Sequence, residues 1–383
     1  MRRLRTASTR RLVTIAAVLV AVVAGAGIAQ AALNSAPKPD PKPLDRAVHD
    51  ALNAPAVEGV TARIEFTNNL LPSGSLPGNA ASPILTGATG RLWLAGDGRL
   101  RLELQSSEGD AQIVADGERY MVYDARSKTA YVGRLPQRKE KPQRRERPSL
   151  EAVQRGLEQL GETWTLSGAT PTSTAGQPTY TVRVSPKDDG GLLGALELAW
   201  DAVRGVPLRA AIYAQGSDDP VLELEATDVS YGKIPASRVD TTVPAGAKVT
   251  EIDPPAGVDA RGKPTHVEGV DEVARRLDFP LVAPDELAGL PRRSVRLIRM
   301  GSETGAVSVY GRGLGAILVF QTKATPQQRP MLTLPQVNID GATGTELATA
   351  LGTMVTFTRD GVRYMVVGSV PPVAAENAAR GLK

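Results

Sequence analysis

Apolar and polar residues alternate along most of the middle of the chain. Runs at 62–66, 91–94 and 100–104 place an apolar side chain at every second position, a period that is typical of strands with one buried face. Asp-Gly pairs at 97–98 and 116–117 follow or separate such runs, and this dipeptide favours tight hairpin turns. The pattern therefore predicts a meander of antiparallel strands with one apolar face.

Residues 150–160 interrupt the meander with a helical period. Their apolar positions share one helix face, and Ser149 precedes them as a candidate N-cap. Further strand patterns follow at residues 180–184, 196–200, 207–213 and 221–225. We expect so long a meander to curve into an open half barrel, with the helix laid across its concave side. Residues 71–87, rich in Pro, Gly and Ser, predict a loop.

The candidate ligand site consists of leucines that alternate along two neighbouring predicted strands. A leucine row inside a concave sheet would form a cavity in which an apolar ligand gains about 25 cal/mol for each Å² of buried surface. Which of the two rows lines the cavity stays open. The candidate cavity residues are Leu92, Leu94, Leu100, Leu102 and Leu104.

Composition shifts divide the chain into segments. Residues 34–58 combine a Pro-rich spacer with a short helix at 44–52, and 59–250 hold the strand-rich first domain. Three prolines and two glycines at 251–266 predict a linker. Residues 267–383 then predict a smaller α+β domain, with a helix at 270–277 and a terminal hairpin around Asp360-Gly361 that leads into an Ala-rich helix.

The first 33 residues predict export. Five arginines precede 22 uncharged residues at 12–33, which as a helix would span roughly 33 Å, enough for a bilayer core. Ala29-Gln30-Ala31 has the small-residue pattern of a signal peptidase site. A cleaved signal peptide and a retained anchor both remain open, and both place the rest of the chain outside the cytoplasm.

The charge outside this segment is balanced. Without the five arginines the chain has 40 Lys and Arg against 41 Asp and Glu, a net charge of 40 − 41 = −1. This balance argues against a nucleic-acid partner. The chain has no cysteine, so it has neither disulfides nor a lipidated N-terminal cysteine.

Few residues are suited to catalysis. The two histidines, His49 and His266, lie near the spacer and in the predicted linker, and zinc-ligand spacing is absent. Gly311-Arg312-Gly313-Leu314-Gly315 joins two strand patterns instead of opening a helix, so we interpret it as a hairpin turn rather than a phosphate loop. We expect a protein that is not an enzyme, with no catalytic residues, no metal and no cofactor. A hydrolase that uses only carboxylates stays a distant alternative.

Three segments carry a resemblance to known proteins. Residues 114–124, and 200–209 followed by 229–235, resemble motifs of the LolA-like superfamily, and 357–382 resemble the C-terminal signature of MucB/RseB-type periplasmic sigma-factor regulators. The resemblance implies a mainly β (α+β) fold: an open antiparallel β-half-barrel with a helical lid, plus a smaller C-terminal α+β domain. It also implies an envelope sensor that binds an apolar lipid or acylated lipoprotein and a membrane anti-sigma factor. The alternative is a LolA-type carrier of lipids or lipoproteins.

Overall fold

The computed structural model describes residues 37–71, 82–135, 147–187, 191–252, 267–300, 303–324 and 334–383. The predicted signal peptide or anchor at 1–33 and most of the predicted linker lie outside these residues. Within the described ranges, no helix has both the length and the apolar character needed to cross a bilayer.

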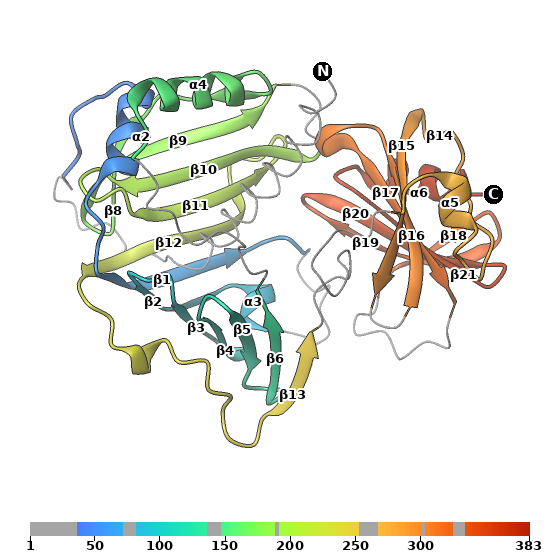
Figure 1. The fold of residues 1–383 in the computed structure, drawn as a ribbon, viewed down its shortest axis with the longest axis horizontal. Helices are drawn as coiled ribbons and strands as arrows, with labels where there is room; N and C mark the ends of the chain where they lie inside the picture. The colour runs from blue at the N-terminus through green and yellow to red at the C-terminus, as the bar shows by residue number, and fades with distance from the viewer. Residues whose placement is uncertain are drawn as a thin grey trace.

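The first part of the chain forms a 13-stranded sheet that curls around itself (Figure 1). Neighbouring strands are antiparallel except β13, which pairs with β6 in parallel. The strand order is β13-β6-β5-β4-β3-β2-β1-β12-β11-β10-β9-β7, with β8 paired to β9. The predicted open antiparallel half barrel is therefore confirmed. The strands are β1 (Gly59–Asn68), β2 (Ala88–Ala95), β3 (Leu100–Ser106), β4 (Gly109–Ala115), β5 (Arg119–Asp124), β6 (Thr129–Arg134), β7 (Trp164–Leu166), β8 (Thr170–Thr174), β9 (Gln177–Pro186), β10 (Leu193–Asp201), β11 (Pro207–Ala214), β12 (Pro220–Tyr231) and β13 (Lys248–Ile252).

Both predicted Asp-Gly turns are present. Gly98 and Gly117 adopt φ of 88° and 93°, in the left-handed region that glycine enters without a steric penalty. The Asp116 carboxylate accepts hydrogen bonds from the backbone N–H of Glu118 at 2.9 Å and of Arg119 at 2.7 Å. These short-range contacts explain why the hairpins are evident in the sequence.

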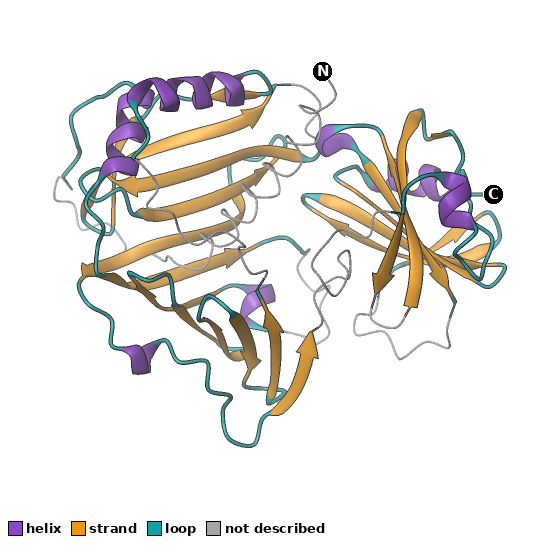
Figure 2. Ribbon diagram, viewed as in Figure 1, coloured by secondary structure: helices purple, strands orange, loops and turns teal. Residues whose placement is uncertain are grey.

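Among the described residues, three α-helices accompany this sheet: α2 (Leu44–Asn53), α3 (Pro83–Thr86) and α4 (Leu150–Gly161). Ser149 caps α4 as predicted, because its hydroxyl accepts a hydrogen bond from the N–H of Ala152 at 3.3 Å. The predicted position of α4 across the concave side is wrong: the helix packs against α2 and the edge strand β7 (Figure 2). Since β7 begins only three residues after α4 ends, the short connection keeps the helix at the sheet edge.

The second part of the chain forms an eight-stranded sheet with helices α5 (Val270–Ala274) and α6 (Pro372–Arg380). The Asp360-Gly361 hairpin joins β20 and β21 as predicted, and Ala375, Ala378 and Ala379 of α6 are fully buried in the core. Helix α5 ends earlier than the predicted 277. The strands are β14 (Glu286–Leu287), β15 (Leu290–Met300), β16 (Glu303–Tyr310), β17 (Ile317–Lys323), β18 (Gln336–Ile339), β19 (Ala342–Thr349), β20 (Gly352–Arg359) and β21 (Val362–Gly368).

Backbone hydrogen bonds join the two sheets' loops at two points. The N–H of Leu192, just before β10, donates to the carbonyl of Ser369 at 3.1 Å, and Ser369 Oγ lies 3.0 Å from the same nitrogen. Leu70, after β1, accepts from the N–H of Ala350 at 3.3 Å. The loops at one end of β1 and β10 therefore contact the loops that follow β19 and β21 (Figure 1).

Candidate functional site

One face of the first sheet is apolar, and we call it the apolar face. Its buried cluster draws on strands β1 to β4, β11 and β12, with the side chain of Ile84 from α3 packed against it. Helix α2 covers the same face near β9 and β10, where Ala47 packs with Tyr180 and Trp200. Hydrophobic burial on this face holds the curled sheet and two of its helices together. The buried members of the main cluster are Ala62, Ile64, Leu92, Leu102, Leu104, Ala111, Leu208, Leu224 and Ala226.

All five candidate leucines lie on β2 and β3, but they differ in burial. Leu92, Leu102 and Leu104 retain only 7%, 3% and 3% exposure within the packed cluster. Leu94 and Leu100 are partly exposed, and Leu100 packs against the cluster. The first three therefore shape the apolar face from within, and a ligand role for any of the five stays a prediction.

A second set of aliphatic side chains lies on the same face and is less covered. Leu222 of β12 pairs directly with Ile212 of β11, Ile212 with Leu196 of β10, Leu196 with Val184 of β9, and Val184 with Leu166 of β7. All five are partly exposed. Direct cross-strand partners project from the same side of a sheet, so they form one continuous stripe, which we call the aliphatic row.

The aliphatic row was not predicted from the sequence. The strands that carry it were predicted, and the alternation of Leu196 with Leu198 and of Leu222 with Leu224 indicated one apolar face. Strand register decides whether such residues line up across a sheet. The register aligns Leu196 with Ile212 and Ile212 with Leu222, and such alignment between separate strands leaves no local pattern in the sequence.

The opposite face of the first sheet carries ion pairs, and we call it the charged face. Arg209 at its centre donates to Glu223 at 2.6 Å, to the Tyr213 hydroxyl oxygen at 2.9 Å and to Glu197. Glu225 lies 3.4 Å from the same guanidinium. A planar, always-charged guanidinium suits this role because it can satisfy several acceptors at once.

Two carboxylates on the charged face have raised pKa values. Burial raises the pKa of Glu65, and the neighbouring Glu223 adds to the rise. Burial also raises the pKa of Glu225; Arg209 opposes that rise, while Glu223 and Glu65 add to it. Glu65 and Glu225 are direct cross-strand partners, and like charges in this position destabilise a sheet.

We expect Glu65→Gln to stabilise the protein near neutral pH by about 0.5 kcal/mol, because it removes one member of a like-charged cross-strand pair. The folded-state pKa of Glu65 lies above its ordinary value of 4.5, so ionisation costs stability as the pH rises through this window. In more acidic solution the gain should vanish. Urea unfolding as a function of pH measures the gain in the free energy of unfolding near neutral pH and its loss in acid. Glu103→Gln is the control: it breaks an ion pair with Arg101 and should not raise the free energy of unfolding.

The Trp200-Asp201 motif, which carries part of the sequence resemblance, has a structural role. Asp201 is fully buried and accepts hydrogen bonds from the N–H groups of Val203 and Arg204, both at 2.8 Å. It also accepts from the Tyr231 hydroxyl at 2.6 Å. Burial and the Asp201 carboxylate raise the pKa of Tyr231, so its hydroxyl remains the donor. The motif thus ties the β10–β11 turn to the end of β12.

Tyr231→Phe should lower the free energy of unfolding by about 2 kcal/mol, because it removes a hydrogen bond to a buried charge. Tyr123→Phe is the matched control, since the hydroxyl of Tyr123 has no hydrogen bond to the residues that the structure describes. Chemical denaturation compares the two, and equal losses would contradict a special role for the Asp201–Tyr231 pair.

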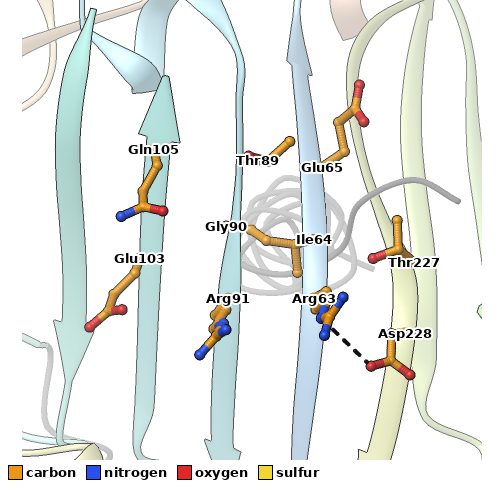
Figure 3. Close-up of a pocket in the computed structure, with 10 residues that line it drawn as sticks. All are labelled: Arg63, Ile64, Glu65, Thr89, Gly90, Arg91, Glu103, Gln105, Thr227 and Asp228. Carbon is orange, nitrogen blue, oxygen red and sulfur yellow. Dashed lines mark ion pairs between the residues drawn. The ribbon is translucent and has the colours of Figure 1, made fainter. Parts of the chain in front are cut away.

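A polar pocket of about 630 Å³ lies on the charged face over β1, β2, β3 and β12 (Figure 3). Arg63 and Arg91 project from neighbouring strands at the same level, and Arg63 lies 3.9 Å from Asp228. A smaller space of about 180 Å³ adjoins it and shares Arg63, Arg91 and Asp228. The pocket and the candidate leucines therefore lie on opposite faces of the same sheet.

The described residues contain no cluster of three His, Cys, Asp or Glu side chains that could hold a metal ion. His49 lies on α2, where its Nδ1 is 3.3 Å from Asp50, and His266 lies outside the described residues. Gly311 to Gly315 form the connection between β16 and β17, as predicted for a turn.

Comparison with known proteins returns structural matches only. No family model matches the chain, and no curated protein matches it. MucB in complex with MucA(peri) matches with a TM-score of 0.40 and 16% identity over 88% of this chain and 95% of that chain. The Pseudomonas aeruginosa MucA/MucB complex matches with a TM-score of 0.42 and 18% identity over 87% and 95%.

A putative outer membrane lipoprotein-sorting protein domain from Vibrio parahaemolyticus matches with a TM-score of 0.23 and 11% identity, over 52% of this chain and 96% of that chain. Structures of MucB and of a lipoprotein-sorting protein domain are thus among the solved structures similar to this chain.

Proposed function

We propose that this chain is a non-enzymatic, extracytoplasmic binding protein that holds an acyl chain of a lipid or lipoprotein on the apolar face of its first sheet. The observation that carries the proposal is the aliphatic row, Leu166, Val184, Leu196, Ile212 and Leu222, which crosses five strands and remains partly exposed. Contiguous partly exposed aliphatic surface on a concave scaffold suits an apolar ligand.

The second domain is the proposed docking module for a membrane partner such as an anti-sigma factor. The resemblance of residues 357–382 to the MucB/RseB signature supports this assignment, and MucB itself has been crystallised with MucA. The uncharged segment 12–33 supports an extracytoplasmic location. Leu192 contacts Ser369 of the second domain, and it precedes Leu196 of the aliphatic row by four residues. A ligand on the row would therefore lie close to the second domain.

Binding of a fluorescent fatty acid tests the apolar site. Ile212→Asn, in the middle of the aliphatic row, should weaken binding about tenfold because apolar contact is lost. Val203→Asn is the matched control, since Val203 is 65% exposed in the β10–β11 turn and should leave binding unchanged. Equal affinity of all three proteins would contradict the proposed site.

Lipid transfer between vesicles separates the regulator from the carrier. A regulator should hold its lipid and form a stable complex with a membrane anti-sigma factor. Rapid transfer between vesicles without any such complex would instead establish the alternative, a LolA-type lipid or lipoprotein carrier.

A further inference from the structure

Two arginines lie directly opposite each other on neighbouring strands of the charged face. Arg63 of β1 and Arg91 of β2 are direct cross-strand partners, and both side chains are exposed. Like charges in directly opposed positions destabilise a strand pair. The pairing therefore carries a cost in the isolated protein that a bound anion would remove.

Neighbouring carboxylates do not neutralise this pair. The ion pair of Arg63 with Asp228 is long, at 3.9 Å, and both of its side chains are 69% exposed, so screening by water leaves it weak. Glu103 is the cross-strand partner of Arg91, but it is held by Arg101 at 2.7 Å. Arg91 has no carboxylate partner in the part of the chain that the structure describes.

A third arginine completes the arrangement. Arg238, from the short helical turn after β12 (Ala236–Arg238), lies over the Trp93 ring at 5.9 Å. It too has no carboxylate partner among the described residues. Trp93 is 9% exposed and packs with Ile234 and Val239, which gives this side of the space a rigid wall.

The three arginines surround the smaller space of about 180 Å³, together with the hydroxyl-bearing Thr61 and Ser230. We call this space the arginine pocket. Its charge is three guanidinium groups against the single carboxylate of Asp228, and its volume is ample for one tetrahedral oxyanion. Guanidinium groups match phosphate oxygens by paired N–H donors, and hydroxyls add further donors.

We propose that the arginine pocket binds a phosphate group, supplied by a free phosphate or phosphomonoester or by the headgroup of an anionic phospholipid. The site lies on the charged face, whereas the proposed acyl site lies on the apolar face of the same sheet. The two sites can therefore be occupied together, and loss of one leaves the other testable.

Calorimetric titration of the full chain with inorganic phosphate, with chloride at equal ionic strength as reference, tests the proposal. Wild-type protein should bind phosphate, and Arg91→Gln or Arg238→Gln should weaken binding about tenfold through loss of one charge-assisted contact. Arg293→Gln is the matched control, because it removes the same charge from an exposed position on β15. No binding to wild type, equal weakening by all three variants, or tighter binding of succinate than of phosphate would overturn the proposal.

Thermal melts without phosphate supply an independent readout. Arg91→Gln should raise the melting temperature because it removes the like charge opposite Arg63, and phosphate should raise the melting temperature of this variant less than it raises that of wild type. A variant that melts below wild type in phosphate-free buffer would contradict the argument.

Vesicles identify the source of the phosphate. Stronger wild-type binding to mixed phosphatidylglycerol and phosphatidylcholine vesicles than to pure phosphatidylcholine, with the difference lost in Arg91→Gln, would assign the pocket to a lipid headgroup. The same binding to both vesicle types, with phosphate binding retained, would assign it to a soluble phosphate compound. Fatty-acid binding should be unchanged in Arg91→Gln. The phosphate proposal can therefore fail while the proposed acyl site on the apolar face stands, and the reverse.

Discussion

Leu102→Glu should destabilise the first domain by about 4 kcal/mol and abolish fatty-acid binding, since it places an unpaired carboxylate in a packed apolar cluster. Leu102 is 3% exposed and lies between Leu92 and Ile113 of the neighbouring strands. Urea unfolding followed by tryptophan fluorescence measures the loss, because Trp93 and Trp200 lie in the same domain.

Gln105→Glu is the matched control for this substitution. It introduces the same carboxylate on the same strand, β3, but Gln105 is exposed and lines the polar pocket of the charged face. We expect its unfolding curve to lie within about 0.5 kcal/mol of wild type. A similar loss for both variants would show that β3 tolerates no added charge and that the assignment of faces is wrong.

Gly191→Ala should separate the two domains. Gly191 has φ of 62°, and an added Cβ would lie 2.0 Å from the carbonyl oxygen of Ser369 in the second domain. Since backbone atoms cannot give way by so much locally, the contact between Leu192 and Ser369 should open. Small-angle X-ray scattering should then show a larger radius of gyration.

Gly216→Ala controls for backbone strain. Gly216 has φ of 73°, but an added Cβ there would meet no atom within 4 Å. Both substitutions thus impose the same left-handed strain, and only Gly191→Ala adds a clash between domains. If the two variants scatter alike, the Leu192–Ser369 contact does not hold the domains together in solution.

Local signals made much of the fold predictable. Turns and helix caps form through contacts within a few residues, so the sequence pattern predicts them. Examples are the Asp-Gly turns at 97–98, 116–117 and 360–361 and the N-cap Ser149. Helix α3 was not predicted, because the Pro- and Ser-rich composition of 71–87 indicates a loop and Ile84 becomes helical where it can pack on the apolar cluster.

The candidate site was predictable in part. Alternation identified the apolar face and its leucines, but it could not show that Leu102 and Leu104 would be buried and that the partly exposed row would lie on β7 and β9 to β12. The arginine pocket depends on the register that opposes Arg63 to Arg91 and on a turn that brings Arg238 over Trp93 from more than a hundred residues away. Tertiary contacts of this kind leave no local pattern.

Photolabelling with a diazirine fatty acid tests the central claim most directly, because it reports where an acyl chain lies on the folded protein. After irradiation and peptide mapping, we expect the label on the aliphatic row, at peptides that contain Leu196, Ile212 or Leu222, with labelling suppressed by excess unlabelled fatty acid. Label confined to the charged face or to the second domain, or label that excess fatty acid does not suppress, would contradict an acyl-binding apolar face.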